Sequence, residues 1–344
     1  MNLEQRISSF TQLGEVLRSG KNLLKVVEEA ERQNAWFTRD NIHKALSYWG
    51  NVLNKATLEH WLERYYPALS NKTVSKRVGV IMAGNIPMVG FHDMLSVLLS
   101  GHHLTARLSS QDSVLIPAIA GILETISPGW AGRIKLTSGE IENPEAIIAT
   151  GSNNTARYFN YYFAKFPHII RKNRTAVAVL DGAETSDDLK GLATDIFSYF
   201  GLGCRNVSKL YLPEGYDIKP LHEALLQYQE LFHHPKYRNN LDYYKSIYLV
   251  NRTRFLDGVF YLFIEAEPLT TPVAVLHYAS YRNLDKVSSA LSNQKEEIQC
   301  IVARKSLMEE NHPCSVVEPG DTQQPSLSDY ADGVDTMAFL LEII

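Results

Sequence analysis

Cysteine is scarce in this sequence. Only three of the 344 residues are cysteines, at positions 204, 300 and 314. Their odd number and wide spacing fit neither a disulfide framework nor the paired Cys-x-x-Cys ligands of a structural zinc site. Any cysteine chemistry is therefore expected to use a single thiol.

Three further features are lacking. No apolar run approaches the ~20 residues of a membrane helix, and the first ten residues, MNLEQRISSF, do not contain the apolar core of a signal peptide. We therefore expect a cytoplasmic protein without a membrane span. A basic excess is also missing, since the formal net charge is −4, and this argues against nucleic acid as a partner.

The pattern of apolar residues predicts alternating strands and helices. Residues 4–67 have apolar positions at helical spacing and form a helical lead-in. Short apolar runs that end in Gly, Ser or Pro predict strands, and the segments between them predict helices. The predicted strands lie at 77–84, 104–108, 145–152, 175–182, 208–213, 259–266 and 272–280, and the helices at 94–99, 114–126, 155–163, 185–200 and 284–292, with a mainly helical stretch at 214–248.

This rhythm is typical of right-handed βαβ units. It predicts an α/β protein with mostly parallel sheets, in which ligands bind beyond the carboxyl ends of the strands. Cys204 follows a predicted helix and precedes a strand, so it is expected on a loop. Cys300 lies in a predicted core strand, and residues 317–329 are predicted to form a loop.

Four motifs stand in a fixed order, separated by helix-sized gaps. They are MAGNIPMVGFHD (82–93), ARLSSQD (106–112), ATGSNNTARYF (149–159) and FGLGCRNVSKLYLP (200–213). Together they resemble the aldehyde dehydrogenase superfamily over roughly residues 76–290. Within it, the sequence is similar to acyl-CoA reductases of the kind that supply long-chain aldehyde to bacterial luminescence.

The resemblance implies an aldehyde-dehydrogenase-like fold of two interleaved Rossmann-like lobes with parallel sheets. Residues 1–174 would form the helical lead-in and nucleotide-binding domain, and residues 175–316 the catalytic domain. Residues 317–344 would return to the first domain or make an oligomer contact, as a strand for example. The superfamily places its nucleophile at the cleft between the lobes.

Two catalytic residues are implied by the resemblance. Cys204 matches the nucleophilic cysteine, although Leu202 replaces the glutamine that usually precedes it by two positions. A loop cysteine near Arg205 and backbone N–H dipoles can be held partly as the reactive thiolate. Asn85 matches the amide of the oxyanion site, where a fixed N–H group stabilises charge on a carbonyl oxygen.

The resemblance also assigns residues to a nicotinamide cofactor. Arg107, Ser109 and Ser110 match the segment that holds the adenosine ribose, with Ser110 in place of a glutamate. An Arg with small hydroxyl groups accommodates a 2′-phosphate that a carboxylate would repel, which favours NADPH. The other residues expected at the cofactor are Ala83 and Gly84 of the first motif and Gly151, Ser152 and Thr155 of the third.

An absence suggests which reaction follows acylation. Aldehyde dehydrogenases that release acids carry a water-activating glutamate, but the matching residues 166–180 contain no Asp or Glu. An acyl-cysteine without that base should be reduced or pass its acyl group to a thiol. His168 in this segment is either an acid–base residue or structural.

Pro268 occupies the place of the ribose-binding glutamate, and Glu267 lies one position earlier. We assign no metal.

These observations predict NADPH-dependent reduction of a fatty acyl-CoA or acyl-protein thioester to an aldehyde, through acyl-Cys204. Three alternatives stay open: an acylating dehydrogenase or acyl phosphate reductase for a short acyl group, a cysteine thioesterase or acyltransferase, and a non-catalytic partner of an acyl-activating enzyme. An acyl-protein synthetase is the partner that the resemblance suggests. The residues leave open the oligomeric state, and whether the aromatic stretch 228–248 lines an acyl channel or packs as an amphipathic helix.

Overall fold

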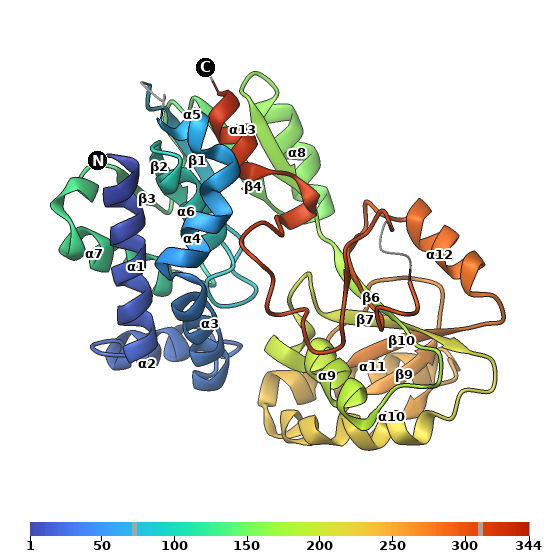
Figure 1. Cartoon of the computed structure of the whole chain (residues 1–344). Helices are drawn as coiled ribbons and strands as arrows, with labels where there is room; N and C mark the ends of the chain where they lie inside the picture. Colours follow the sequence, from blue (N-terminus) through green and yellow to red (C-terminus); the bar gives the residue numbers. More distant parts are fainter. Residues whose placement is uncertain (71–73, 309–311, 344) are drawn as a thin grey trace. The chain divides into compact units, whose positions relative to one another are not determined.

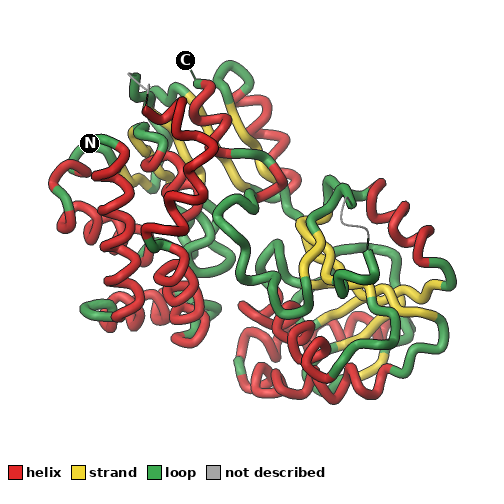
Figure 2. Tube along the Cα trace, viewed as in Figure 1, coloured by secondary structure: helices red, strands yellow, loops and turns green. Residues whose placement is uncertain are grey.

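The computed structural model describes residues 1–70, 74–308 and 312–343 (Figure 1). The chain forms two compact units. Unit 1 consists of Met1–Asn173 and Ser326–Ile344, and unit 2 of Arg174–Pro325. Both are α/β structures, in which the strands are joined mainly by helices (Figure 2).

The first seventy residues are helical, as predicted. Side-chain oxygens of Asn2, Thr38 and Asn54 accept backbone N–H groups at three helix starts, which provides partners for donors that the helices leave unpaired. The apolar faces bury side chains such as Phe10 and Leu13 in the core of unit 1. The elements are α1 (Leu3–Ser19), α2 (Leu24–Gln33), α3 (Arg39–Val52), α4 (Lys55–Leu62), η1 (Glu63–Tyr65) and α5 (Tyr66–Ser70).

Unit 1 contains a five-stranded parallel sheet with the order β3-β2-β1-β4-β5. This confirms the predicted α/β class with parallel βαβ connections. The prediction missed the two edge strands, β3 and β5, which have four residues each and are only partly buried. The strands are β1 (Arg77–Ile81), β2 (His103–Arg107), β3 (Ile134–Thr137), β4 (Ala146–Thr150) and β5 (His168–Arg171). The helical elements are α6 (Phe91–Leu99), α7 (Leu115–Ile126), η2 (Pro128–Trp130) and α8 (Asn153–Phe163).

The end of the chain packs within unit 1. It forms the short helix η5 (Ala331–Gly333) and then α13 (Thr336–Glu342). The buried guanidinium of Arg171 in β5 donates to both carboxylate oxygens of Asp93 in α6, at 2.6 and 2.5 Å, and to Thr336 Oγ1 at 2.8 Å. A buried charge that is paired in this way joins the edge strand to two helices. The described part of the tail thus ends in a helix that belongs to unit 1.

Unit 2 contains a seven-stranded sheet with the order β12-β11-β6-β7-β10-β9-β8. All neighbours are parallel except β8 and β9, which confirms the prediction of mostly parallel sheets. The strands are β6 (Thr175–Val179), β7 (Val207–Pro213), β8 (Leu256–Asp257), β9 (Leu262–Glu265), β10 (Val275–Tyr281), β11 (Ile298–Val302) and β12 (Val316–Val317). The helical elements are α9 (Ser186–Phe197), η3 (Ser198–Gly201), α10 (Ile218–Leu225), η4 (Leu226–His233), α11 (Pro235–Val250) and α12 (Leu284–Asn293).

Two predicted strands of unit 2 begin later than their apolar runs do. Val259 and Ala274 have positive backbone φ angles, 74° and 66°, which are turn conformations. Each apolar run therefore starts in a turn, and β9 and β10 follow it. Cys300 is fully buried in β11, as predicted.

Candidate active site

The turn that carries Cys204 begins earlier than the sequence predicted. Helix α9 ends at Phe197, and Tyr199, Phe200 and Gly201 then have φ angles of 53°, 61° and 74°. Left-handed conformations are costly for large residues and persist only where the surroundings enforce them. The Phe200 ring is buried, and its centroid lies 4.5 Å from the centroid of the His234 ring. His234 is the residue just before α11. Packing therefore holds the turn, and the predicted helix end at Gly201 is wrong.

Asn206 fastens this turn to the preceding helix. Its side chain is buried, and its Oδ1 accepts the N–H of Gly203 at 2.8 Å. Its Nδ2 donates to the carbonyl oxygens of Asp195 and Ser198, both at 2.9 Å. One amide thus connects the end of α9, the turn and the residue before Cys204, so the loop has a defined conformation.

Replacing Asn206 with alanine should lower the free energy of unfolding by about 3 kcal/mol, because it leaves buried donor and acceptor groups without partners. Chemical denaturation measures this change. Asn239→Ala, at an exposed asparagine of α11, is the matched control and should change stability by less than about 0.5 kcal/mol. Equal stability of the two variants would contradict the fastening role.

Cys204 is the most accessible of the three cysteines. It is partly exposed, whereas Cys300 and Cys314 are buried. Burial raises the pKa of the Cys314 thiol, which disfavours its thiolate. The neighbouring Arg205 donates through Nε to the carbonyl oxygen of Thr322 at 2.6 Å. Accessibility and a constrained loop make Cys204 the cysteine best suited to act as a nucleophile.

The segment around Thr322 is attached to α9 through Asp195. This fully buried carboxylate accepts the backbone N–H groups of Gly320 and Thr322, at 2.7 and 3.1 Å, and the Thr322 hydroxyl at 2.7 Å. Gly191 permits the approach, since a Cβ there would lie 2.6 Å from the carbonyl oxygen of Pro319. Burial raises the pKa of Asp195 to about 6. The predicted loop at 317–329 is therefore held in place where it passes α9.

This raised pKa predicts how stability depends on pH. Because the folded protein binds the Asp195 proton more tightly than the unfolded chain does, Asp195 contributes most to the free energy of unfolding at a pH below its ordinary pKa near 4. This contribution is lost as the pH rises through about 6. Relative to an Asp195→Asn variant, the wild-type unfolding free energy should fall by roughly 1–3 kcal/mol between pH 4 and pH 7. Urea titrations at each pH measure it, and parallel curves for both proteins would contradict the assignment.

In unit 1, several predicted cofactor residues lie at the carboxyl ends of adjacent strands. Ile81 of β1 pairs with Arg107 of β2, so Gly84 and Ser109 follow neighbouring strand ends. A Cβ on Gly84 would lie 2.5 Å from Ser109 Oγ. Arg107 and Ser110 are exposed, and Ala83 and Asn85 are partly buried. The structure thus brings two of the predicted contacts together at a place where only glycine fits.

A buried carboxylate supports the loop that contains Asn85. Met88 has a φ of 60° and donates its N–H to Asp112 Oδ2 at 2.9 Å. Burial raises the pKa of Asp112 to about 6, while backbone N–H groups, first that of Met88, act in the opposite direction. Asp112 ends the ARLSSQD motif, so this bond connects the loops after β1 and β2. The sequence analysis did not identify this hydrogen bond, although the position of Asp112 just before a predicted helix could have indicated it.

The third motif opens a helix at the end of β4. Ser152 is the N-cap of α8, and its Oγ accepts the N–H of Thr155 at 3.2 Å. The Ser152 and Thr155 hydroxyl groups are 2.9 Å apart. A Cβ on Gly151 would lie 3.0 Å from the ring of Phe159. Helix starts of this kind present N–H groups and a positive dipole end to anions.

The remaining sequence candidates have structural partners. His168 begins β5, and its Nδ1 lies 2.8 Å from the carbonyl oxygen of Phe166. The carbonyl oxygen of Glu267 accepts from the buried Lys209 ammonium at 2.6 Å, and that of Pro268 lies 2.9 Å from His277 Nδ1. Burial lowers the pKa of Lys209. The sequence analysis missed Lys209, because a lysine in a short strand is usually exposed.

No helix in 1–70, 74–308 or 312–343 has both the length and the apolar character needed to cross a bilayer. Over the same ranges, no three His, Cys, Asp or Glu side chains gather as a metal site would require.

Comparison with known proteins identifies the fold. No family model matches the sequence, and no curated protein matches it. Solved structures do. Aldehyde dehydrogenase 21 from Physcomitrella patens, in complex with succinate, aligns with a TM-score of 0.70 and 11% identity over 100% of this chain and 84% of that one. An NAD-dependent benzaldehyde dehydrogenase from Corynebacterium glutamicum aligns with a TM-score of 0.66 and 12% identity over 94% of this chain and 83% of that one. An aldehyde dehydrogenase from Mycobacterium tuberculosis complexed with NAD+ also aligns, with a TM-score of 0.60 and 13% identity over 88% of this chain and 73% of that one. The chain therefore has the aldehyde dehydrogenase fold.

Proposed function

We propose that this protein is an aldehyde-forming oxidoreductase of the aldehyde dehydrogenase superfamily. In the proposed reaction, a fatty acyl thioester is reduced with NADPH through an acyl-Cys204 intermediate. The observation that carries the proposal is the setting of Cys204: a partly exposed cysteine on a fastened loop, in a chain with this fold. Its two other cysteines are buried.

The proposed nucleotide site lies in unit 1. Gly84, with no Cβ, lets Ser109 lie against the loop after β1, and the start of α8 offers N–H groups and two hydroxyls to a pyrophosphate. Arg107 is exposed at the end of β2, where a 2′-phosphate could meet its guanidinium. Solved structures with this fold are complexed with NAD+, which supports a nicotinamide cofactor. NADPH is proposed from Arg107 and Ser110.

In the proposed mechanism, the Cys204 thiolate attacks the thioester carbonyl carbon. The carbonyl oxygen gains negative charge, which the Asn85 side-chain amide and the Cys204 backbone N–H would stabilise. The acyl carbon keeps its bond to Cys204 Sγ and releases the original thiolate, which takes up a proton. A nicotinamide cofactor, which the unit 1 residues named above would hold, would supply the hydride that reduces the acyl carbon. The thiohemiacetal oxyanion formed on Cys204 re-forms its C=O bond as the C–S bond breaks, which gives the aldehyde and returns the Cys204 thiolate.

The lack of Asp and Glu in one segment favours reduction over hydrolysis. Residues 166–180, which match the segment that carries this glutamate in acid-forming relatives, contain no Asp or Glu. The one imidazole of this segment is that of His168, and its Nδ1 lies 2.8 Å from the carbonyl oxygen of Phe166. An acyl-cysteine in this setting should therefore survive until hydride arrives.

A series of acyl-CoAs tests the proposal. NADPH oxidation and aldehyde formation should be equimolar and should increase from acetyl-CoA to long-chain substrates. Activity confined to acetyl-CoA or to an acyl phosphate would instead support the short-chain alternative. Thiol release without NADPH oxidation would identify a thioesterase or acyltransferase. A protein that turns over none of these substrates would be the non-catalytic partner.

A further inference from the structure

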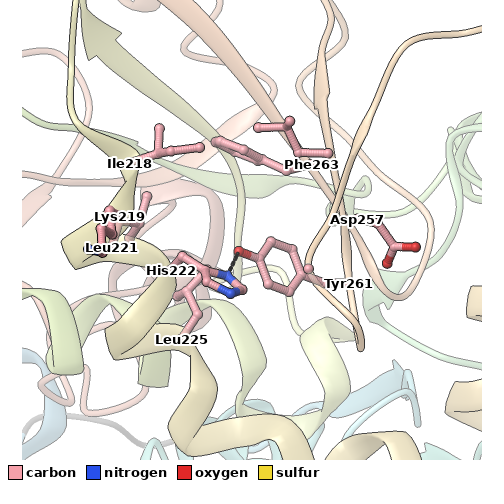
Figure 3. A pocket seen from close by; sticks show the side chains of 10 residues that line it. Ile218, Lys219, Leu221, His222, Leu225, Asp257, Tyr261 and Phe263 are labelled. Carbon is pink, nitrogen blue, oxygen red and sulfur yellow. Dashed lines mark hydrogen bonds between the residues drawn. The ribbon is translucent and has the colours of Figure 1, made fainter.

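A cavity of about 320 Å³ lies in unit 2 between α10 and the hairpin formed by β8 and β9 (Figure 3). No residue of the four sequence motifs lines it. Its volume is in the range of small-molecule sites, and its walls are mainly apolar, as such sites usually are. The apolar and aromatic wall is formed by Ile218, Leu221, Leu225, Leu256, Tyr261 and Phe263.

Gly258 shapes one wall of this cavity. A Cβ there would lie 2.2 Å from Cε1 of the Tyr261 ring, a separation that no side chain could occupy. The Gly258 N–H also donates to the Tyr261 carbonyl oxygen at 2.9 Å, which closes the hairpin turn. The glycine therefore allows the Tyr261 ring to lie beside the cavity.

A polar pair stands in the apolar wall. His222 Nδ1 lies 2.9 Å from the Tyr261 hydroxyl, as Figure 3 shows. Burial raises the pKa of Tyr261 to about 12, so its hydroxyl keeps its proton near neutral pH. Among the side-chain contacts of the described residues, the His222 ring makes this hydrogen bond and no other. Its second ring nitrogen can therefore bond to a ligand.

The charges of the side chains that line the cavity do not cancel. Asp257 is paired with Lys245, which lies outside the cavity. Lys219 is exposed at the cavity, and no ion pair of the described residues includes it. The lining thus has one uncompensated positive charge beside apolar walls, which suits an anionic group attached to an apolar body.

From these features we infer that the cavity binds a medium-chain aliphatic carboxylate, with its chain along the apolar wall and its carboxylate at Lys219 and His222. At about 30 Å³ per non-hydrogen atom, the volume of a water molecule in the liquid, the cavity holds about ten such atoms. Octanoate has this size. The site is separate from the Cys204 loop, and the inference does not depend on the reductase activity.

Calorimetric titration of the full chain with octanoate tests this site. The wild type should bind one octanoate saturably, and octylamine at least tenfold more weakly. Lys219→Glu should weaken octanoate binding at least tenfold and leave octanol binding unchanged. Leu256→Asp, at a wall residue that is 48% exposed, should weaken both at least tenfold. Leu249→Asp is the matched control, since this leucine of α11 is 61% exposed and does not line the cavity.

Several outcomes would overturn the inference. They are no saturable binding by the wild type, unchanged binding by Leu256→Asp, or unchanged octanoate binding by Lys219→Glu. Thermal unfolding of each variant shows whether it is folded. Cys204→Ser should bind octanoate as the wild type does, because Cys204 does not line the cavity. A loss of binding in that variant would place the octanoate at the Cys204 loop and would also contradict a separate site.

Discussion

Replacing Cys204 with serine should lower NADPH oxidation with acyl-CoA by at least about a thousandfold, because it removes the proposed nucleophile, on which the acyl group would be carried. A serine hydroxyl has the same shape but is far less ionised than a thiol at neutral pH. Nucleotide binding should be unchanged, since Cys204 belongs to unit 2 and the proposed nucleotide residues to unit 1. Steady-state assays and a fluorescence titration with NADPH measure the two effects.

The matched control for this variant is Cys314→Ser. Cys314 is buried, its thiol pKa is raised, and it has no role in the proposed reaction. This variant should keep activity within a few-fold of the wild type, provided that it remains folded. If Cys204→Ser kept its activity, or if Cys314→Ser alone abolished it, the assignment of the nucleophile would be wrong.

Replacing Arg107 with glutamate should raise the KM for NADPH at least tenfold and change that for NADH much less. The substitution exchanges an attractive charge for a repulsive one at the proposed 2′-phosphate position. Arg107 is the exposed last residue of β2, so the change should cost little stability. The ratio of kcat/KM for the two nucleotides is the measurement.

Lys135→Glu gives the same change of charge on the neighbouring strand β3. Lys135 is an exposed residue whose ammonium pairs with Glu142, and it is outside the motifs. This control should leave the nucleotide preference unchanged. Equal losses for NADPH and NADH in Arg107→Glu would remove the argument for a 2′-phosphate site.

Much of the strand and helix pattern could be predicted because local rules decide it. The run RVGVI is apolar and short, and it forms the fully paired strand β1. The edge strand β3 was missed, because its sequence IKLT alternates a charge with apolar residues over only four positions. Short edge strands give little periodic signal.

The loop position of Cys204 could also be predicted, but not what holds it. A helix followed by a glycine-rich stretch and a strand indicates a loop. The left-handed turn at Tyr199 and Phe200 depends on rings that belong to a later part of the chain. The fastening by Asn206 depends on carbonyl groups that α9 leaves unpaired at its end. Such contacts arise only when the chain has folded.

Burial of charge was the least predictable feature. Lys209 lies in the strand SKLYLP, where alternation would place a lysine at the surface, yet it is almost fully buried. Its partner is a backbone carbonyl 58 residues away in sequence. Asp112 and Asp195 likewise accept backbone N–H groups from loops. Backbone acceptors and donors have no sequence signature, so the sequence does not indicate such partners.

Trapping the intermediate tests the central claim most directly. The protein is incubated with a long-chain acyl-CoA in the absence of NADPH, and peptide mapping by mass spectrometry locates the acyl group. We expect one acyl group per chain as a thioester on Cys204, which NADPH then converts to free aldehyde without release of fatty acid. An acyl group on another residue, or its release as the free acid, would contradict this account.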